Sequence, residues 1–424
     1  MGILLMVSML VFLLVSVPIA ISLGLASALV VWWQGELPLL LLAQREFASV
    51  DSVPLMAIPF FILAGLLMEE GGISKRLVNM ASALIGHLTG GLGMVSVVTA
   101  MFFATVSGSS AATTAAIGAI LIPAMINQGY RRDFSAAVQA VSGELGVIIP
   151  PSIPLILYGV ATQTSITHLF IAGVIPGIFV GISLMATVYV LSRKRGFSKE
   201  NRATWSERYR TFREAFWALL MPFIILGGIY GGVFTPTEAA AIAIVYALII
   251  GLFVYREIRW RRLLSLLGDA VITTSAVMFI IANTGLFSWI LSRANVAAKV
   301  GAFFVDLSSS PVVFLLIVNL LLFIVGMFFE TSPAIIILAP LLTPVAVHMG
   351  IDPIHFGIIM IVNLAMGMCT PPLGINLFIS CDIANIGLEQ ITRAVLPFIV
   401  VLIADVLILS YLPFLSLWLP GVFR

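Results

Sequence analysis

Apolar stretches separated by short polar segments run along almost the whole chain. A helix rises about 1.5 Å per residue, so roughly 20 apolar residues span the hydrocarbon core of a bilayer. Some stretches are shorter than this and others are longer, which predicts helices that are broken or that do not cross. The stretches cover residues 2–33, 53–69, 91–106, 110–127, 134–161, 168–191, 215–233, 236–255, 269–292, 311–329, 333–348, 353–383 and 388–419.

The first stretch, 2–33, is too long for one unbroken span. We expect two short helices that meet near Pro18, because proline interrupts a helix. The pair 215–233 and 236–255 repeats this arrangement, since Pro236 lies 218 residues after Pro18.

Two further segments, about 74–88 and 256–267, mix basic and apolar residues. This composition suits helices that lie in the membrane interface. The alternative for each segment is a plain connecting loop.

Two pairs of short apolar stretches predict helical hairpins, at about 91–127 and 311–348. Polar tips join the arms, Ser107–Ser110 in the first hairpin and Glu330–Pro333 in the second. A polar tip is costly in hydrocarbon, so it is tolerated only where it lines a protein cavity. We therefore expect re-entrant hairpins that place both tips at mid-depth without crossing the membrane.

A short motif occurs twice in altered form. Gly146–Pro151 returns 221 residues later as Gly367–Pro372, and Met101–Thr105 returns as Met327–Thr331. Two related halves, each with a Gly/Pro break inside an apolar stretch, are the sequence signature of a secondary transporter. The sequence therefore predicts a first repeat at 1–192 with a broken helix at about 134–161, a linker at 193–214, and a second repeat at 215–424 with a broken helix at about 353–383.

The composition predicts an all-α integral membrane protein. Apolar residues make up 61% of the chain and charged residues 9%, and the mean hydropathy is +1.17. A domain in water could not bury so much apolar surface, so the surrounding solvent is lipid, where helices satisfy their own backbone. The net charge of +2 gives no indication of a nucleic-acid partner, and two cysteines do not suggest a disulfide framework.

The basic residues indicate the orientation. If each half crosses five times and its hairpin does not cross, 17 of the 21 Lys and Arg residues fall on one side. By the positive-inside rule that side is cytoplasmic. Five crossings per half also make the two repeats inverted, with the linker in the cytoplasm and both termini in the periplasm.

The breaks and tips carry candidate chemistry for a cation. A helix interrupted at a Pro-Pro pair exposes carbonyls on its first half and N–H groups on its second half. Unwound carbonyls and hydroxyls suit Na⁺, although a simple kink is the alternative for each break. The candidate sodium ligands are Ser107, Gly108, Gly146 and Pro150 at a first site, and Glu330, Thr331, Ser332, Gly367 and Thr370 at a second.

No arginine lies inside an apolar stretch, except Arg393 near an expected helix end. An anionic substrate would therefore be held by helix N-termini, hydroxyls and bound Na⁺. The alternative for each hydroxyl is a hydrogen bond back to its own helix. The candidate substrate-binding residues are Ser109, Ser110, Thr113, Thr114, Ser152 and Asn376.

Acids at membrane depth are candidates for function. Glu144 near the first break and Asp382 after the second are the candidate functional acids, with a hydrogen-bonded scaffold role as the alternative for Glu144. Glu238 follows Pro236 and is interpreted as a first-turn helix residue. No metal spacing of histidines, nucleophile elbow or Gly-rich phosphate loop occurs, so the sequence does not predict an enzyme.

Several short sequence motifs, in order along nearly the whole chain, resemble those of the large membrane subunit of TRAP transporters, the DctM type. The resemblance implies an elevator-type transporter that couples Na⁺ to uptake of organic acid anions in the bacterial inner membrane. Because the carbonyl-rich break occurs twice, we expect two or more Na⁺ ions per substrate. The range of these anions extends from C4-dicarboxylates to sialic, sugar and keto acids. Two partners are also implied, a small four-helix membrane subunit and a periplasmic substrate-binding protein. The motifs that carry the resemblance are Ile58–Gly65, Ser107–Ser110, Gly129-Tyr130, Ile149–Ser152, Ala172–Gly177 and Thr235–Ala239.

Two other functions stay open from the sequence. A stand-alone sodium–carboxylate symporter of similar inverted-repeat build would transport alone in liposomes, without a binding protein. A membrane-embedded enzyme would need a paired-Asp or metal motif, which the sequence lacks.

Overall fold

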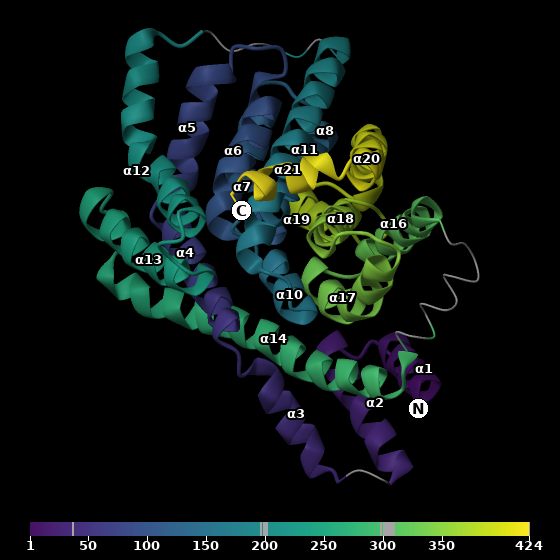
Figure 1. The fold of residues 1–424 in the computed structure, drawn as a ribbon. Coiled ribbons are helices and arrows are strands. Elements are labelled where there is room, and N and C mark those ends of the chain that lie inside the picture. The colour runs from purple at the N-terminus through teal and green to yellow at the C-terminus, as the bar shows by residue number, and fades with distance from the viewer. Residues whose placement is uncertain (36–37, 196, 198–201, 297–298, 300–309, 424) are drawn as a thin grey trace.

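The computed structural model describes residues 1–423, except 36–37, 196, 198–201, 297–298 and 300–309 (Figure 1). The described residues form helices and loops and no strand, which confirms the all-α class. Nine of the described helices are long and apolar enough to cross a bilayer, and a pair bent by 42° at the first Pro-Pro break adds a tenth.

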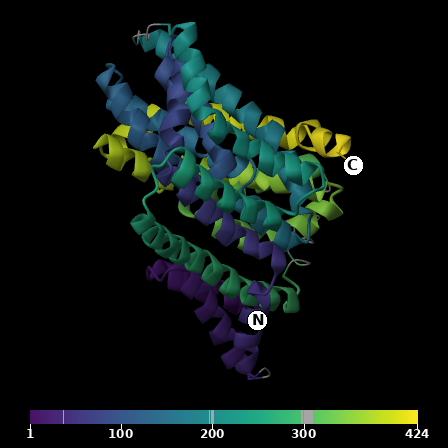
Figure 2. The same cartoon turned by 90° about the vertical axis from the view of Figure 1, so that its left-hand side faces the viewer.

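A long helix, α14, runs obliquely across the molecule (Figure 1). A group of three N-terminal helices lies on its far side from the main bundle, as the perpendicular view in Figure 2 also shows. α14 packs against two of these helices, and residues of α1, α2 and α14 form an apolar core separate from that of the main bundle. The bounds are α14 Trp260–Arg293, α1 Gly2–Leu14, α2 Ile19–Gln34 and α3 Leu40–Val50.

The stretch 2–33 forms two helices, as the sequence predicts. α1 ends at Leu14, and α2 begins at Ile19 directly after Pro18. The segment 256–267 differs from expectation, because most of it belongs to α14 and not to a separate interfacial helix. α14 contains no proline, and each of its two glycines, Gly268 and Gly285, costs only about 1 kcal/mol in a helix interior, so nothing interrupts it.

An outer layer flanks the bundle, with α13 packed on α4 and α12 packed on α5. Both α12 and α13 begin with a capping box, and the backbone N–H of Thr235 donates to the Glu238 carboxylate at 2.8 Å. This bond confirms Glu238 as a first-turn helix residue. The bounds are η1 Val53–Met56, α4 Ala57–Glu70, α5 Ile73–Ile85, α12 Trp205–Tyr230, α13 Pro236–Ile249 and η2 Ile250–Val254.

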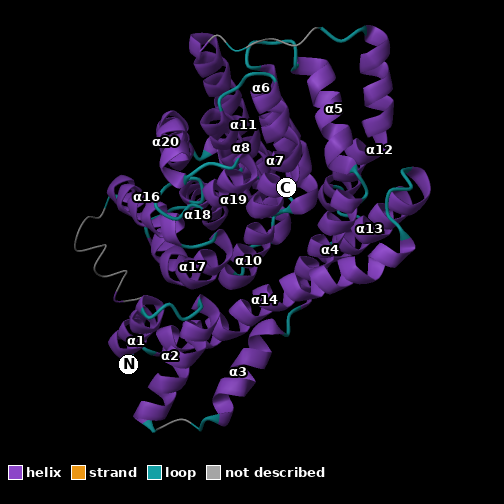
Figure 3. Cartoon of the chain, turned by 180° about the vertical axis from the view of Figure 1, so that it is seen from behind, coloured by secondary structure: helices purple, strands orange, loops and turns teal. Residues whose placement is uncertain are grey.

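The remaining helices form the inner bundle, seen from behind in Figure 3. Two hairpins, α6–α7 and α16–α17, stand beside two interrupted helices, α8–α9–α10 and α18–α19. The bounds are α6 Gly91–Ser107, α7 Ser110–Asn127, α8 Arg132–Gly143, α9 Leu145–Ile148, α10 Ile153–Thr162, α11 Ile166–Arg195, α16 Pro311–Phe328, α17 Thr331–His348, α18 Pro353–Gly367, α19 Ile375–Ala384, α20 Leu388–Tyr411 and α21 Phe414–Val422.

The same pattern of contacts occurs in both halves of the bundle. Within each half, the first hairpin arm packs on the first part of the broken helix, α6 on α8 and α16 on α18. Between the halves, the second part of each broken helix packs on the second arm of the opposite hairpin, α10 on α17 and α19 on α7. The halves therefore interlock around the hairpins and the breaks.

The linker expected at 193–214 is shorter in the structure. α11 continues to Arg195, and α12 begins at Trp205 after its N-cap Thr204. Strong capping at Thr204 and the apolar pattern that follows extend α12 into the charged segment. Residues 196 and 198–201 of the linker lie outside the described part of the chain.

Candidate functional site

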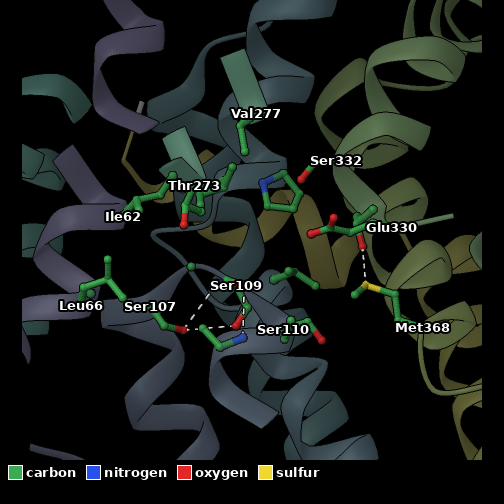
Figure 4. Close-up of a pocket in the computed structure, with 18 of the residues that line it drawn as sticks. Ile62, Leu66, Ser107, Ser109, Ser110, Thr273, Val277, Glu330, Ser332 and Met368 are labelled. Carbon is green, nitrogen blue, oxygen red and sulfur yellow. Dashed lines mark hydrogen bonds between the residues drawn. The ribbon is translucent and has the colours of Figure 1, made fainter. Parts of the chain in front are cut away.

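Both hairpin tips open into one cavity of about 330 Å³. In Figure 4 the first tip lies below the cavity and Glu330 and Ser332 of the second tip lie to one side, while α4 and α14 supply the opposite wall. The structure thus brings together tips that are more than 200 residues apart in sequence. The lining residues are Ile62, Gly65, Leu66, Glu69, Phe103, Ser107, Gly108, Ser109, Ser110, Ala111, Ala112, Val147, Ile153, Pro154, Thr273, Val277, Glu330, Thr331, Ser332 and Met368.

The first tip is fastened to the first break. Gly108 ends α6 with a φ of +58°, a conformation that favours glycine. A Cβ at Gly108 would stand 3.1 Å from the carbonyl oxygen of Pro151, and the N–H of Ile153 donates to the Gly108 carbonyl at 3.3 Å. The tip therefore sits directly against the Pro-Pro segment.

The hydroxyls of the first tip divide into two sets. Ser109 caps α7 by accepting from the N–H of Ala112, and Ser110 follows it into the cavity wall. Thr113 and Thr114 are buried outside the lining and donate back to the carbonyls of Ser109 and Ser110, at 2.8 and 2.9 Å. These two threonines show the intrahelical bonding that was the alternative reading.

Thr113 also connects the tip to the break. Its hydroxyl lies 2.7 Å from the hydroxyl of Ser107. A Cβ on Gly146 would overlap Thr113 Oγ1, so only glycine permits this approach. Ser152 is buried and donates to the carbonyl of Val147 at 2.6 Å, which makes it a brace inside the break. The Pro150–Pro151 bond at its centre is cis.

Asn376, on the second break, reaches across to the first half. Its side-chain amide donates to Ser110 Oγ at 2.6 Å and to the Ala140 carbonyl at 3.1 Å. The thiol of Cys369 donates to the same carbonyl and lies 3.7 Å from Glu144 Oε2. Glu144 is buried at this junction and does not line the cavity.

The second tip faces the cavity with Glu330, Thr331 and Ser332. The Thr331 hydroxyl donates to the sulfur of Met368 at 2.9 Å, which ties the tip to the second break (Figure 4). Behind it, a Cβ on Gly367 would overlap the backbone of Gly326, so α16 and α18 touch through glycine.

Besides Asn376, three sequence-predicted residues of the second half lie outside the cavity lining. Gly367 is behind the wall, and Thr370 donates to the Met366 carbonyl at 2.9 Å. Asp382 is exposed near the end of α19 and does not line the cavity. Asp382 lies about two helical turns beyond the start of α19, which carries it away from the tips.

The opposite wall was missed by the sequence reasoning. Ile62, Leu66 and Glu69 recur on one face of α4, and Thr273 with Val277 recur on one face of α14. A Cβ on Gly65 would stand 3.4 Å from Cα of Ser107, so α4 approaches the tip closely. Glu69 is exposed, which places it at the cavity mouth. An acid ending an apolar stretch was the available signal.

The geometry and the fold define a class, a membrane transporter with paired hairpins and broken helices around one cavity. Within that class, the chain belongs to the family described as the tripartite ATP-independent periplasmic transporter, DctM component, whose model matches residues 6–415. It is therefore a large permease subunit of a TRAP transporter, as the resemblance implied.

Individual relatives agree with the family. The isethionate TRAP transporter permease protein DctMQ of Oleidesulfovibrio alaskensis is 46% identical over 414 residues, which cover 97% of this chain and 65% of that relative. The C4-dicarboxylate TRAP transporter large permease protein DctM of Rhodobacter capsulatus is 40% identical over 423 residues, 96% of each chain. The solved structure of the YdaH transporter of Alcanivorax borkumensis shares the fold, with a TM-score of 0.60, 15% identity and coverage of 88% of this chain and 87% of that one.

Proposed function

We propose that this permease subunit takes up organic acid anions across the bacterial inner membrane by sodium symport. The observation that carries the proposal is the single cavity into which both hairpin tips project. Its polar groups come from Ser107–Ser110 and Glu330–Ser332 at the tips and from Glu69 and Thr273 on the opposite wall, and the rest of its lining is mostly apolar. A mostly apolar pocket with a few convergent polar groups is typical of a solute site.

The donor atoms support sodium as the coupling ion. The tips offer hydroxyls, backbone carbonyls and one carboxylate, which are the oxygen ligands that Na⁺ takes in transporters. The described residues contain no group of three or more His, Cys, Asp or Glu side chains that would suit a heavier metal. We assign a first ion to the first tip and first break, at Ser107, Gly108, Gly146 and Pro150. A second ion is assigned to Glu330, Thr331 and Ser332 of the second tip, because Gly367 and Thr370 lie away from the cavity.

The substrate anion is assigned to the start of α7. Ser109 and Ser110 lie at this helix N-terminus, where the free N–H groups and the dipole favour negative charge. No Lys or Arg lines the cavity in the described part of the chain, so bound Na⁺ supplies the balancing charge. Hydrogen bonds outside the cavity hold these groups in place. Thr113 and Thr114 donate to the carbonyls of Ser109 and Ser110, Asn376 donates to the Ser110 hydroxyl, and Ser152 donates to the Val147 carbonyl in the break.

The cavity is lined by two separate groups of helices, and this division supports an elevator mechanism. The hairpins and broken helices interlock with one another, whereas α4 and α14 close the cavity from outside that unit. We infer that the interlocked unit carries substrate past α4 and α14. The working complex would include a periplasmic substrate-binding protein and a small four-helix membrane subunit. The DctMQ relative extends beyond the matched region, which supports the second partner.

Transport in proteoliposomes tests the proposal. Isethionate and succinate serve as probes, because relatives are named for isethionate and for C4-dicarboxylates. We expect uptake to require Na⁺ and to rise with a Hill coefficient above one, since two sites are assigned. Uptake that is unchanged when choline replaces Na⁺ contradicts the coupling. Uptake that needs no binding protein favours a stand-alone symporter instead.

A further inference from the structure

A second cavity, of about 640 Å³, lies between the start of α8 and the start of α20. It shares no lining residue with the cavity at the hairpin tips. Three of its seven lining residues are arginines, and two are acids. The seven lining residues are Arg131, Arg132, Asp133, Ile386, Glu389, Gln390 and Arg393.

The arginines are held in different ways. Arg132 donates to the carbonyl of Ala384 at 3.2 Å, which fixes it at the junction of α8 and α19. Arg131 pairs with Asp133 at 2.7 Å, and Arg393 pairs with Glu389 at 3.0 Å. The Arg393–Glu389 side chains are 80% and 85% exposed, and exposed pairs contribute little stability, so Arg393 can readily exchange its partner.

The local field favours an anion. The three arginines outnumber the two acids by one charge. The N-termini of α8 and α20 both begin at this cavity and add their positive dipole ends. By the charge bias of the sequence, this edge belongs to the cytoplasmic surface, where anionic lipid headgroups lie.

An apolar strip continues from Arg393 along α20. Leu396, Val400, Ile403 and Leu407 are exposed and follow Arg393 at helical spacings of three and four, so they share its face. From Leu396 to Leu407 the strip is about 17 Å long at about 1.5 Å per residue, roughly half of a hydrocarbon core of about 30 Å. A headgroup at the arginines would therefore have its acyl chains beside this strip.

We propose that the cavity lined by Arg131, Arg132 and Arg393 binds the phosphate headgroup of an anionic phospholipid, with its acyl chains along the exposed face of α20. Free phosphate shares the headgroup chemistry, but it would leave the apolar strip unused. The site lies on the interlocked unit and is separate from the cavity at the tips, so it does not rest on the transported substrate.

The test compares lipid retention by variants of the full chain, purified with any membrane subunit that it needs. Native mass spectrometry counts bound phosphatidylglycerol against bound phosphatidylcholine. We expect the double variant Arg131→Gln/Arg393→Gln to bind phosphatidylglycerol at least about tenfold more weakly, because it loses charge-assisted contacts. Binding of phosphatidylcholine should not change.

Two further variants keep the test decisive. Glu389→Gln removes the competing acid, so we expect tighter phosphatidylglycerol binding, the opposite change from the arginine variant. The matched control is Arg210→Gln, since Arg210 also belongs to an exposed i,i+4 pair, with Glu214, but lies on α12. The proposal is overturned if the arginine variant retains as much phosphatidylglycerol as the control. Binding of inorganic phosphate as tight as that of phosphatidylglycerol would overturn the acyl-chain part.

Discussion

A hydrogen bond joins Asn376 to Ser110, 266 positions earlier in the chain, at the wall of the candidate site. Because the amide donates to a hydroxyl that also lines the cavity, it orients that hydroxyl toward a ligand. Both side chains are buried, so neither exchanges freely with water. Through this bond α19, which follows the second break, contacts the tip of the first hairpin.

We expect Ser110→Ala to weaken apparent substrate affinity. Losing one hydrogen bond to a charged ligand costs roughly 1.5–3 kcal/mol, or about tenfold to over a hundredfold in affinity. Uptake measured against substrate concentration checks this. The control is Ser27→Ala in α2, where the hydroxyl donates to the Leu23 carbonyl at 2.7 Å, outside the cavity. Unchanged affinity in a folded Ser110 variant would place the substrate elsewhere.

Glu69 at the cavity mouth suggests a second residue-scale test. If the proposed anion binds in the cavity and the mouth faces the cytoplasm, the negative charge of Glu69 opposes that anion and should assist its release. We expect Glu69→Gln to tighten substrate binding from the cytoplasmic side by roughly fivefold, because it removes this repulsion. Counterflow with internal substrate measures the change.

The neighbouring acid provides the control for Glu69. Glu70 pairs with Arg262 at 3.2 Å and does not line the cavity. Glu70→Gln should leave cytoplasmic-side affinity unchanged, because this carboxylate does not face the cavity. The variant should also stay folded, since an exposed ion pair contributes at most about 1 kcal/mol to stability. Equal effects of the two substitutions would show that Glu69 acts only through overall surface charge.

The sequence could predict the residue types at the site more readily than their directions. Ser109 and Ser110 face the cavity as expected, whereas Thr113 and Thr114, one turn later, bond back to the helix. Which hydroxyls face a ligand depends on how α7 rotates against α8, and that rotation follows from packing between distant segments. The site assignments therefore stay predictions until the variants are measured.

At the scale of elements, the breaks and hairpins could be read from local chemistry. Polar tips mark helix ends within a residue or two, and the observed bounds of both hairpins follow them. Pro-Pro pairs mark the breaks within two residues in the first half and within four in the second. α3 could not be found this way, because its Arg45 and Glu46 interrupt the apolar pattern. The wall made by α4 and α14 depends on contacts that hydropathy does not encode.

The contact of α16 with α18 gives a prediction for an element. A Cβ on Gly367 would overlap the backbone of Gly326, so Gly367→Ala should force the helices apart and cost about 1–3 kcal/mol. A lower melting temperature in detergent would show this. The control is Gly268→Ala in α14, where a Cβ meets nothing within 4 Å. There the higher helix propensity of alanine should leave stability unchanged or raise it. Equal melting temperatures for both variants would contradict the close packing.

At the scale of the whole molecule, orientation decides which wall of the cavity faces which compartment. α12 is the most direct place to determine it, because its 26 residues are long enough to cross the bilayer. Basic residues gather before and within its first turns, and its other end leads into the turn at Val233. The two ends should therefore lie on opposite sides.

Cysteine labelling at the two ends of α12 tests this orientation. Single replacements, Thr204→Cys and Val233→Cys, are exposed to a membrane-impermeant thiol reagent in intact spheroplasts. The native Cys369 and Cys381 are buried, so they add little background. We expect labelling at 233 but not at 204 until the cells are opened, because the positive-inside rule places position 204 in the cytoplasm. The reverse pattern would invert the molecule and turn the Glu69 mouth toward the periplasm. Labelling of both positions in intact spheroplasts would mean that α12 does not cross, and the count of five crossings per half would then be wrong.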